Sequence, residues 1–239
     1  MRPARIAELL EPYIQEANDQ RTTSDALLQH ISTYIDILLR WNARINLTAI
    51  RSEEEIVTRH FGESLFTARH LFPKVYLVSP VPPVVKGFDS DADDDRRPAP
   101  DNGIRVADLG SGAGFPGIPI KLWAPHIAMT LIESNHKKAT FLREVVRSLT
   151  LTNIDIQNAR AETLPPSSFE IITVRAVERL NQVLPVAAKL LAPGGRLALL
   201  ISSAQQEAIT STLRNFNWKP PTPIPNSESR QLLIGQNTP

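Results

Sequence analysis

The sequence predicts an α/β fold, in which helices cover both faces of a mainly parallel sheet and a helical region precedes it. Two observations lead to this prediction. Within residues 1–75, apolar residues recur at helical spacing. From Ile104 onward, short apolar runs that suit buried strands alternate with helical segments. Parallel neighbours require such crossover connections, so the second pattern indicates a parallel sheet.

The helical region is predicted from spacing and from helix-capping residues. Over residues 24–41, apolar residues recur at positions i, i+3, i+4 and i+7, and Ser24 is a suitable N-cap. A second helix begins at Ser52, where Glu55 three residues later predicts a capping box. A weaker pattern predicts a helix over residues 4–17. We therefore expect a small helical unit at this end of the chain.

The stretch that follows has a different composition. Prolines and aspartates dominate residues 79–103, which can neither bury apolar surface nor continue a helix. We expect residues 76–103 to form a flexible insertion. It would separate an N-terminal helical cap, residues 1–75, from a sheet domain, residues 104–239.

Strands and helices alternate through the sheet domain. Strands are predicted over residues 104–109, 128–133, 154–157, 169–174 and 196–201, and near 231–234. Helices are predicted over residues 116–123 and 135–149, from the fourth strand to Leu191, and near 205–213. Pro193, Gly194 and Gly195 predict the turn that leads into the fifth strand.

Composition excludes several classes of protein. The chain has no cysteine, so disulfides, cysteine-bound zinc and thiolate catalysis are excluded. The five histidines are scattered, and we expect no metal site. No apolar run reaches the ~18–20 residues of a membrane span, and the N-terminus lacks the pattern of a secretion signal, so we expect a cytoplasmic protein.

Charge is unevenly distributed. The net charge is +1, but residues 89–101 hold six acidic and two basic residues, and without them the chain carries +5. A mildly basic folded part is compatible with an anionic partner such as nucleic acid. On charge alone, a solvated surface is the favoured interpretation.

A glycine-rich turn follows the first predicted strand. Asp108 ends the strand, and the turn holds Gly110, Gly112 and Gly114. In parallel sheets, ligands bind beyond the carboxyl ends of the strands, and glycines let a nucleoside approach the backbone closely. Glu133 ends the second strand, where its carboxylate can accept hydrogen bonds from both ribose hydroxyls. With Asp108 facing the charged amino-acid end, the cofactor predicted here is S-adenosylmethionine.

Two other interpretations of the turn remain open. Residues 112–117 match the dinucleotide fingerprint G-x-G-x-x-G, with an acid at Glu133. In that fold, however, the strand runs almost into the first glycine of the motif, whereas here it ends at Leu109 and Gly110 already begins the turn. Pro116 and Pro119 also fall awkwardly in a pyrophosphate-binding turn. A glycine-rich turn without any ligand is the other alternative.

The residues that are absent narrow the methyl acceptor. Transfer to cytosine C5 normally uses a cysteine nucleophile, and the chain has none. Exocyclic amines of bases are usually methylated beside an Asn/Asp-Pro-Pro-aromatic motif, which is also absent. A ring nitrogen such as guanine N7 loses no proton on attack, so it needs neither group. Alignment of the reactants can then supply much of the rate.

Several segments together resemble the bacterial glucose-inhibited division protein B family, also called RsmG. The matching segments are Arg40 to Thr48 (Arg-Trp-Asn-Ala-Arg-Ile-Asn-Leu-Thr), Arg59-His60 with Glu63-Ser64, Asp108 to Ile120, Leu131 to Ser134, Lys137-Lys138 with Phe141-Leu142, and Val174 to Ala176. The resemblance implies methylation of guanine N7 in the 530 loop, the decoding region of 16S rRNA, with S-adenosylmethionine as donor. It also implies a Rossmann-like class I methyltransferase fold with a seven-stranded sheet and an N-terminal helical cap.

The resemblance also implies a set of site residues. The cofactor residues would be Asp108, Gly110, Ser111, Gly112, Gly114, Phe115, Glu133, Ser134, Ala161, Glu162 and Arg175. Arg175 would also be the catalytic residue that positions the acceptor base, since no general base is expected. The RNA-facing residues would be Asn46, Arg59, His60, Lys137, Lys138 and Arg160. The implied partner is 16S rRNA or the 30S subunit, and we expect a monomer.

Two departures from the family pattern stand out. The acidic stretch 79–103 is an insertion that we expect to point away from RNA. The family usually has a lysine-glycine pair after the fifth strand, whereas this chain has Ile201 to Gln205, which puts a substrate role for that loop in doubt. A methyltransferase of small molecules or proteins, or a ribosome-assembly module that binds the cofactor without turnover, remain alternatives.

Overall fold

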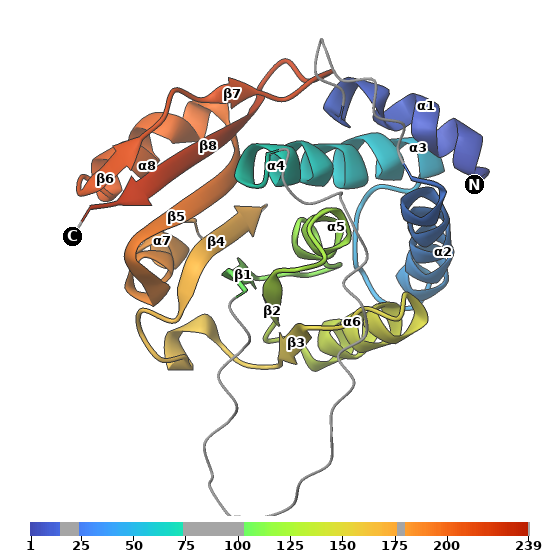
Figure 1. Ribbon diagram of the computed structural model, residues 1–239, viewed down its shortest axis with the longest axis horizontal. Coiled ribbons are helices and arrows are strands. Elements are labelled where there is room, and N and C mark those ends of the chain that lie inside the picture. The colour runs from blue at the N-terminus through green and yellow to red at the C-terminus, as the bar shows by residue number, and fades with distance from the viewer. Residues whose placement is uncertain (15–23, 74–102, 176–179, 239) are drawn as a thin grey trace, which may run out of the picture.

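The computed structural model describes residues 1–14, 24–73, 103–175 and 180–238. Figure 1 shows one twisted sheet between two groups of helices. The N-terminal helices and α5 and α6 lie on one side of the sheet, and α7 and α8 lie on the other. The predicted insertion, residues 76–103, lies outside the described residues except for Gly103. The segment 176–179 after the fourth strand also lies outside them.

The N-terminal region is helical, as predicted. It consists of α1 (Pro3–Ile14), α2 (Asp25–Asn42), α3 (Glu53–Glu55), the π-helical turn η1 (Ile56–Gly62) and α4 (Glu63–Leu71). Ser24 is the N-cap of α2, and its hydroxyl accepts a hydrogen bond from the backbone N–H of Leu27. Residues 15–17 of the first predicted helix lie outside the described residues.

The second predicted helix forms, but it is not regular. Ser52 caps it by accepting from the backbone N–H of Glu55 at 3.5 Å. The chain then enters the π-helical turn η1 before it returns to α-helix at Glu63. A Cβ atom on Gly62 would lie 2.8 Å from the ring of Tyr13, so this glycine allows α1 to pack closely against the turn. Hydrophobic spacing alone did not predict the turn, because it perturbs the spacing only locally.

The strands form one sheet with a mainly parallel half. They are β1 (Arg105–Leu109), β2 (Ala128–Ile132), β3 (Ile154–Gln157), β4 (Phe169–Arg175), β5 (Leu191–Ser202), β6 (Phe216–Trp218), β7 (Thr222–Pro223) and β8 (Arg230–Asn237). Their order is β3-β2-β1-β4-β5-β8-β6, and β7 pairs with β8. The first five strands are parallel, and β8 is antiparallel to β5, β6 and β7. The seven strands of the main path agree with the sheet that the resemblance implied.

Helices cover both faces of this sheet. They are α5 (Gly117–Trp123), α6 (His136–Ser148), α7 (Leu180–Leu190) and α8 (Gln206–Thr212), with short 3-10 turns η2 (Ala161–Thr163) and η3 (Ser203–Gln205). One apolar core joins α1, α2 and α4 to α5, α6 and one face of the sheet. A second core lies between the opposite face and α7 with α8. The N-terminal helices therefore share a core with the sheet.

The C-terminal third departs from the prediction in detail. Strand β5 begins at Leu191 instead of Arg196, because Leu191 already pairs with Phe169 before the register shifts. Gly194 has a φ of +72° within that irregular start. Strands β6 and β7 were not predicted, since runs of three and two residues are too short to show alternation.

The parallel register brings the ends of four strands to one edge. Leu109 at the end of β1 pairs with Ile132 of β2 and with Val174 of β4. Arg175 pairs with Leu200 of β5. The glycine turn, Glu133 and Arg175 therefore follow their strands at the same edge, which is where ligands bind in such sheets.

Candidate active site

The glycine turn leaves β1 as a tight, internally bonded loop. The backbone N–H groups of Gly110 and Ser111 donate to the carbonyl of Ile132 at 2.9 and 3.0 Å, so the loop is tied to the end of β2. Gly112 has a φ of +56°, and a Cβ atom there would meet only the carbonyl of Gly110, 3.7 Å away. The surface above Gly112 is thus open enough for a flat nucleoside to approach the backbone.

Glu133 joins the glycine loop to the start of α6. One carboxylate oxygen accepts from the backbone N–H of Gly112 at 2.9 Å, and the other accepts from that of Asn135 at 2.7 Å. The residue is only 7 % exposed. A carboxylate has about four acceptor sites, so these two bonds leave each oxygen able to accept from one more donor. That arrangement suits the pair of ribose hydroxyls expected from the sequence.

Asp108 is a buried residue of β1. Its side chain is 1 % exposed and points into the protein, where it accepts from the backbone N–H of Gly117 at 3.2 Å and from the hydroxyl of Thr173 at 2.8 Å. Burial raises the pKa of this carboxyl to about 6, and the hydrogen bonds partly oppose that shift. Asp108 thus supports the loop from inside, and its expected contact with the amino-acid end of a cofactor stays a prediction.

Phe115 is also directed away from an open site. Its ring stacks between Tyr34 of α2 and His60 of η1, with centroid distances of 5.3 and 4.7 Å. The Tyr34 hydroxyl donates to the carbonyl of Ala113, which fixes the loop against the N-terminal helices. The ring of Phe115 lies in the core that joins the loop to these helices, and its expected contact with the cofactor stays a prediction.

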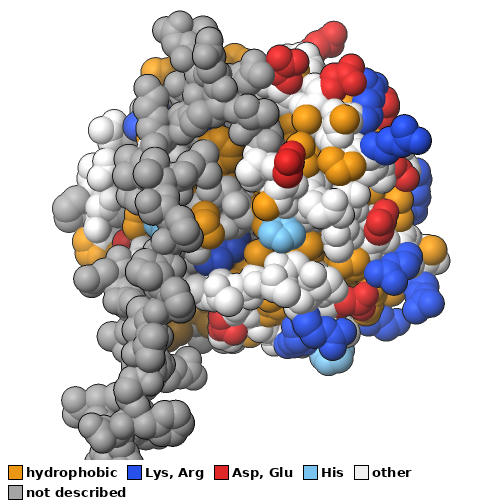
Figure 2. Space-filling model, turned by 45° about the vertical axis from the view of Figure 1, so that its right-hand side comes forward, with side chains coloured by type: hydrophobic (Ala, Val, Ile, Leu, Met, Phe, Trp, Pro, Cys, Tyr) orange, Lys and Arg blue, Asp and Glu red, His pale blue; other side chains and the backbone are white. Residues whose placement is uncertain are grey.

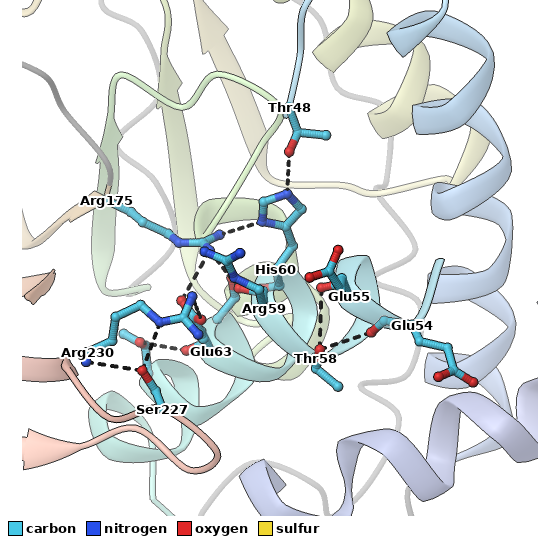
Figure 3. Close-up of polar contacts among 12 residues, drawn as sticks. Thr48, Glu54, Glu55, Thr58, Arg59, His60, Glu63, Arg175, Ser227 and Arg230 are labelled. Carbon is cyan, nitrogen blue, oxygen red and sulfur yellow. Dashed lines mark hydrogen bonds and ion pairs between the residues drawn. The ribbon is translucent and has the colours of Figure 1, made fainter. Parts of the chain in front are cut away.

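His60 connects this ring stack to Arg175. Its Nδ1 lies 3.0 Å from Nη1 of Arg175, and its Nε2 lies 2.8 Å from the Thr48 hydroxyl (Figure 3). An arginine can only donate, so Nδ1 accepts, and a neutral His60 carries its proton on Nε2. Burial and the nearby arginines lower the pKa of His60 to about 3, which keeps the ring neutral. His60 is thus suited to orient Arg175 and not to remove protons.

Arg175 is held on several sides at the end of β4. Its Nη2 donates to the backbone carbonyl of Arg59 at 2.6 Å and to the carboxylate of Glu63 at 3.1 Å. Its side chain is only 13 % exposed. Glu63 is 2 % exposed, and its second oxygen lies 2.6 Å from Nη1 of Arg230, although the angle is poor for a hydrogen bond. These three side chains, Arg175, Glu63 and Arg230, therefore form a buried network with a fixed geometry.

A cavity of about 250 Å³ opens beside this network. It lies between the ends of β4 and β5 and the start of β8, and it is lined by three arginines (Arg59, Arg175 and Arg230), Glu63, Ser202, Gln205 and apolar side chains. Arg230 and Glu63 had no assigned role in the sequence interpretation. The sequence did point to Glu63, because it is a charged residue within the apolar stretch of a predicted helix. Arg230 begins a strand, and nothing in the sequence pointed to it.

The remaining expected cofactor residues lie around the end of β3. Ala161 and Glu162 form the turn η2, with Ala161 partly buried and Glu162 exposed. Ser134 is exposed next to Glu133, and its carbonyl accepts from the side-chain amide of Asn158. The expected position of an adenine beside η2 stays a prediction.

Comparison with known proteins identifies the family. The sequence model described as rRNA small subunit methyltransferase G (GidB) matches residues 27–76 and 97–220. The chain belongs to this family. A relative from Xylella fastidiosa (strain 9a5c), named ribosomal RNA small subunit methyltransferase G, is 38 % identical over 177 residues, which cover 74 % of this chain and 69 % of the relative. One of the same name from Xanthomonas euvesicatoria pv. vesicatoria (strain 85-10) is 32 % identical and covers 98 % of each chain.

Solved structures agree with the fold. The [4+2]-cyclase SpnF is 14 % identical and superposes with a TM-score of 0.50 over 58 % of this chain and 76 % of that one. As a member of the rRNA small subunit methyltransferase G family, the protein is an S-adenosylmethionine-dependent methyltransferase of small-subunit rRNA. The resemblance described from the sequence is confirmed, and the methyl-donor interpretation of the glycine turn prevails over the dinucleotide one.

Of the six residues expected to face RNA, Arg59 and His60 contact Arg175, and the other four lie on other elements. Lys137 and Lys138 begin α6, where Asn135 caps the helix by accepting from their backbone N–H groups. Figure 2 shows Lys and Arg side chains along the right-hand and lower margins of one face, interspersed with acidic ones. Arg160 is exposed at the start of η2, and Asn46 is exposed in the loop after α2. The structure brings Arg59 and His60 together with Arg175, whereas a role in RNA binding for the other four residues stays a prediction.

Among residues 1–14, 24–73, 103–175 and 180–238, no group of histidine and acidic side chains could hold a metal ion. In the same part of the chain, no helix is long and apolar enough to cross a membrane.

Proposed function

We propose that this protein transfers a methyl group to N7 of a guanine in the 530 loop of 16S rRNA. The observation that carries the proposal is the chemistry of the cavity beside Arg175, where we place the methyl acceptor. Arginines line the cavity there, and no described side chain that faces it is a free general base. Guanine N7 attacks through a lone pair and loses no proton, so it needs no base.

The candidate bases near the cavity are all engaged. Arg175 and Arg230 hold Glu63, and although burial raises the pKa of this carboxyl, both arginines oppose the shift. His60 accepts from Arg175 through the nitrogen that would take a proton. Asp108 is bonded inside the protein. Methylation of an amine or hydroxyl that must be deprotonated is therefore less compatible with the site than methylation of a ring nitrogen.

The donor end of the site fits S-adenosylmethionine. When bound, this cofactor supplies the electrophilic methyl group of a sulfonium. Glu133 would accept hydrogen bonds from the ribose hydroxyls, and the open backbone at Gly112 would lie beneath the nucleoside. The Tyr34 contact to the glycine loop and the bond from Arg175 to His60 would keep donor and acceptor in alignment.

The basic side chains of α6 support an RNA substrate. Lys137, Lys138, Arg143 and Arg147 all lie on this helix, and they would contact phosphates outside the catalytic cavity. We include in the proposal that the protein acts as a cytoplasmic monomer on the 30S subunit.

The test is radiolabelled methyl transfer from S-adenosylmethionine to 30S subunits that lack the modification, followed by identification of the labelled nucleoside. Fully modified 30S subunits are the matched control. Label in 7-methylguanosine from the 530 loop supports the proposal. Label in another nucleoside, or equal label in both kinds of subunit, would contradict it.

A further inference from the structure

The cavity beside Arg175 is lined by both apolar and charged residues. Its apolar walls are formed by Val174, Leu180, Leu200, Ile201 and Ile224. The same cavity is also lined by Arg59, Arg175, Arg230 and Glu63. A site of this kind suits a ligand that has an apolar or aromatic part and an anionic part.

The charges of this network do not balance. Among the described residues that line the cavity, Arg59, Arg175 and Arg230 contribute three positive charges and Glu63 contributes one negative charge. The surplus is therefore two positive charges in a partly enclosed space, where charge is poorly screened. A neutral base would leave this surplus unchanged, whereas a backbone phosphate would neutralise one of the two charges.

Arg230 has the geometry of a preorganised anion ligand. Its Nε donates to the Ser227 hydroxyl at 3.0 Å, and its Nη1 contacts Glu63 at 2.6 Å (Figure 3). No acceptor contacts its Nη2 within the described residues. Its side chain is 27 % exposed, twice as much as that of Arg175. Arg230 is thus fixed on one edge and open on the other.

We propose that this cavity binds an RNA phosphate next to the target nucleotide, and that Arg230 is the positioning residue that receives it. The open edge of Arg230 would bind two phosphate oxygens, while the apolar walls would contact the attached sugar or base. Ser202 and Gln205 would form the rim of the site. The loop from Ile201 to Gln205 would then contact substrate, although it lacks the lysine-glycine pair. This inference rests on the proposed function, because it assumes an RNA acceptor.

The test is a salt titration of methyl transfer to unmodified 30S subunits with Arg230→Gln. We expect KM for the subunits to rise about tenfold to 100-fold, since a charge-assisted contact is lost. The slope of log KM against log salt should fall by about 0.7–0.9, the value for one phosphate contact. The affinity for S-adenosylmethionine should stay unchanged, because Arg230 does not contact the glycine loop.

Three variants provide the controls. Arg230→Lys keeps the charge toward Glu63, so it should restore the salt slope while recovering only part of KM. Arg214→Gln removes an exposed arginine outside the cavity and should leave both values unchanged. Gln205→Glu retains the acceptor oxygen that caps Ser202, but it adds a negative charge to the cavity rim and should raise KM.

Each outcome has a distinct meaning. An Arg230→Gln protein with the KM and salt slope of Arg214→Gln overturns the inference and leaves the proposed function intact. The inference is also overturned if Arg230→Gln lowers the melting temperature, the cofactor affinity and the turnover together but leaves the salt slope unchanged. Arg230 would then act only through Glu63. If the wild type transfers no methyl group to RNA, the proposed function fails, and this inference fails with it.

Discussion

Glu133 offers the most direct test of the cofactor site. Its two oxygens already accept from the backbone N–H groups of Gly112 and Asn135, which leaves one acceptor position on each oxygen. Two ribose hydroxyls that donate to a charged acceptor would contribute about 1.5–3 kcal/mol each, or about 3–6 kcal/mol together. Glu133→Ala should therefore weaken S-adenosylmethionine binding by about two to four orders of magnitude. Loss of the two loop hydrogen bonds would act in the same direction.

Isothermal titration calorimetry measures this effect directly. Glu207→Ala is the matched control, because Glu207 is an exposed acid on α8. Both variants should keep the circular dichroism spectrum of the wild type. If folded Glu133→Ala bound the cofactor as tightly as the Glu207 control, the assignment of Glu133 to the ribose would be refuted.

Three further predictions concern the residues between loop and cavity. Arg175→Lys keeps the charge that Glu63 needs but loses the planar fork, so turnover should fall about 100-fold at unchanged cofactor affinity, and normal turnover would contradict this. Tyr34→Phe leaves the buried carbonyl of Ala113 without its donor. This should lower the free energy of unfolding by about 1–3 kcal/mol and the melting temperature by roughly 2–12 °C. An unchanged melting temperature in calorimetry would exclude the contact. The pKa of His60 is lowered to about 3 in the folded protein, so on acidification the unfolded chain binds a proton before the folded protein does. The wild type therefore loses stability as the pH falls from 6 to 4. His60→Gln lacks this loss, so its stability relative to the wild type should rise by up to about 1.4 kcal/mol for each pH unit of that fall. Urea unfolding at several pH values checks this, and parallel curves for both proteins would disprove it.

Most of the fold was predictable because its longer helices and strands show their hydrophobic pattern within a single stretch of sequence. Helices α2 and α6 have clear apolar faces and side-chain caps, and both formed within one residue of the predicted bounds. Strands β6 and β7 escaped prediction because their pairing with β8 is a tertiary event that no pattern in two or three residues reports. The proposed domain boundaries stay a prediction, since most of the stretch 76–103 lies outside the described residues.

The candidate site was predictable where function depends on a contiguous motif. The glycine turn and Glu133 lie together at the expected edge of the sheet. Contacts that depend on partners distant in the sequence were not predicted. Asp108 turns inward because Gly117 and Thr173 supply donors there. The position of Arg230 beside Glu63 depends on a strand that pairs far along the chain, and sequence spacing carries no information about such proximity.

The π-helical turn Ile56–Gly62 has a consequence for how this chain can change in length. A π turn accommodates one more residue than the α-helical turn it replaces. Closure of this turn to α-helix with all its residues retained would rotate one end against the other by about 100°. His60 and Glu63 could then no longer face Arg175 together. Substitutions on the exposed side of this helix should be tolerated, whereas a further insertion that the turn cannot absorb should not, so the π turn is itself a functional property of the chain.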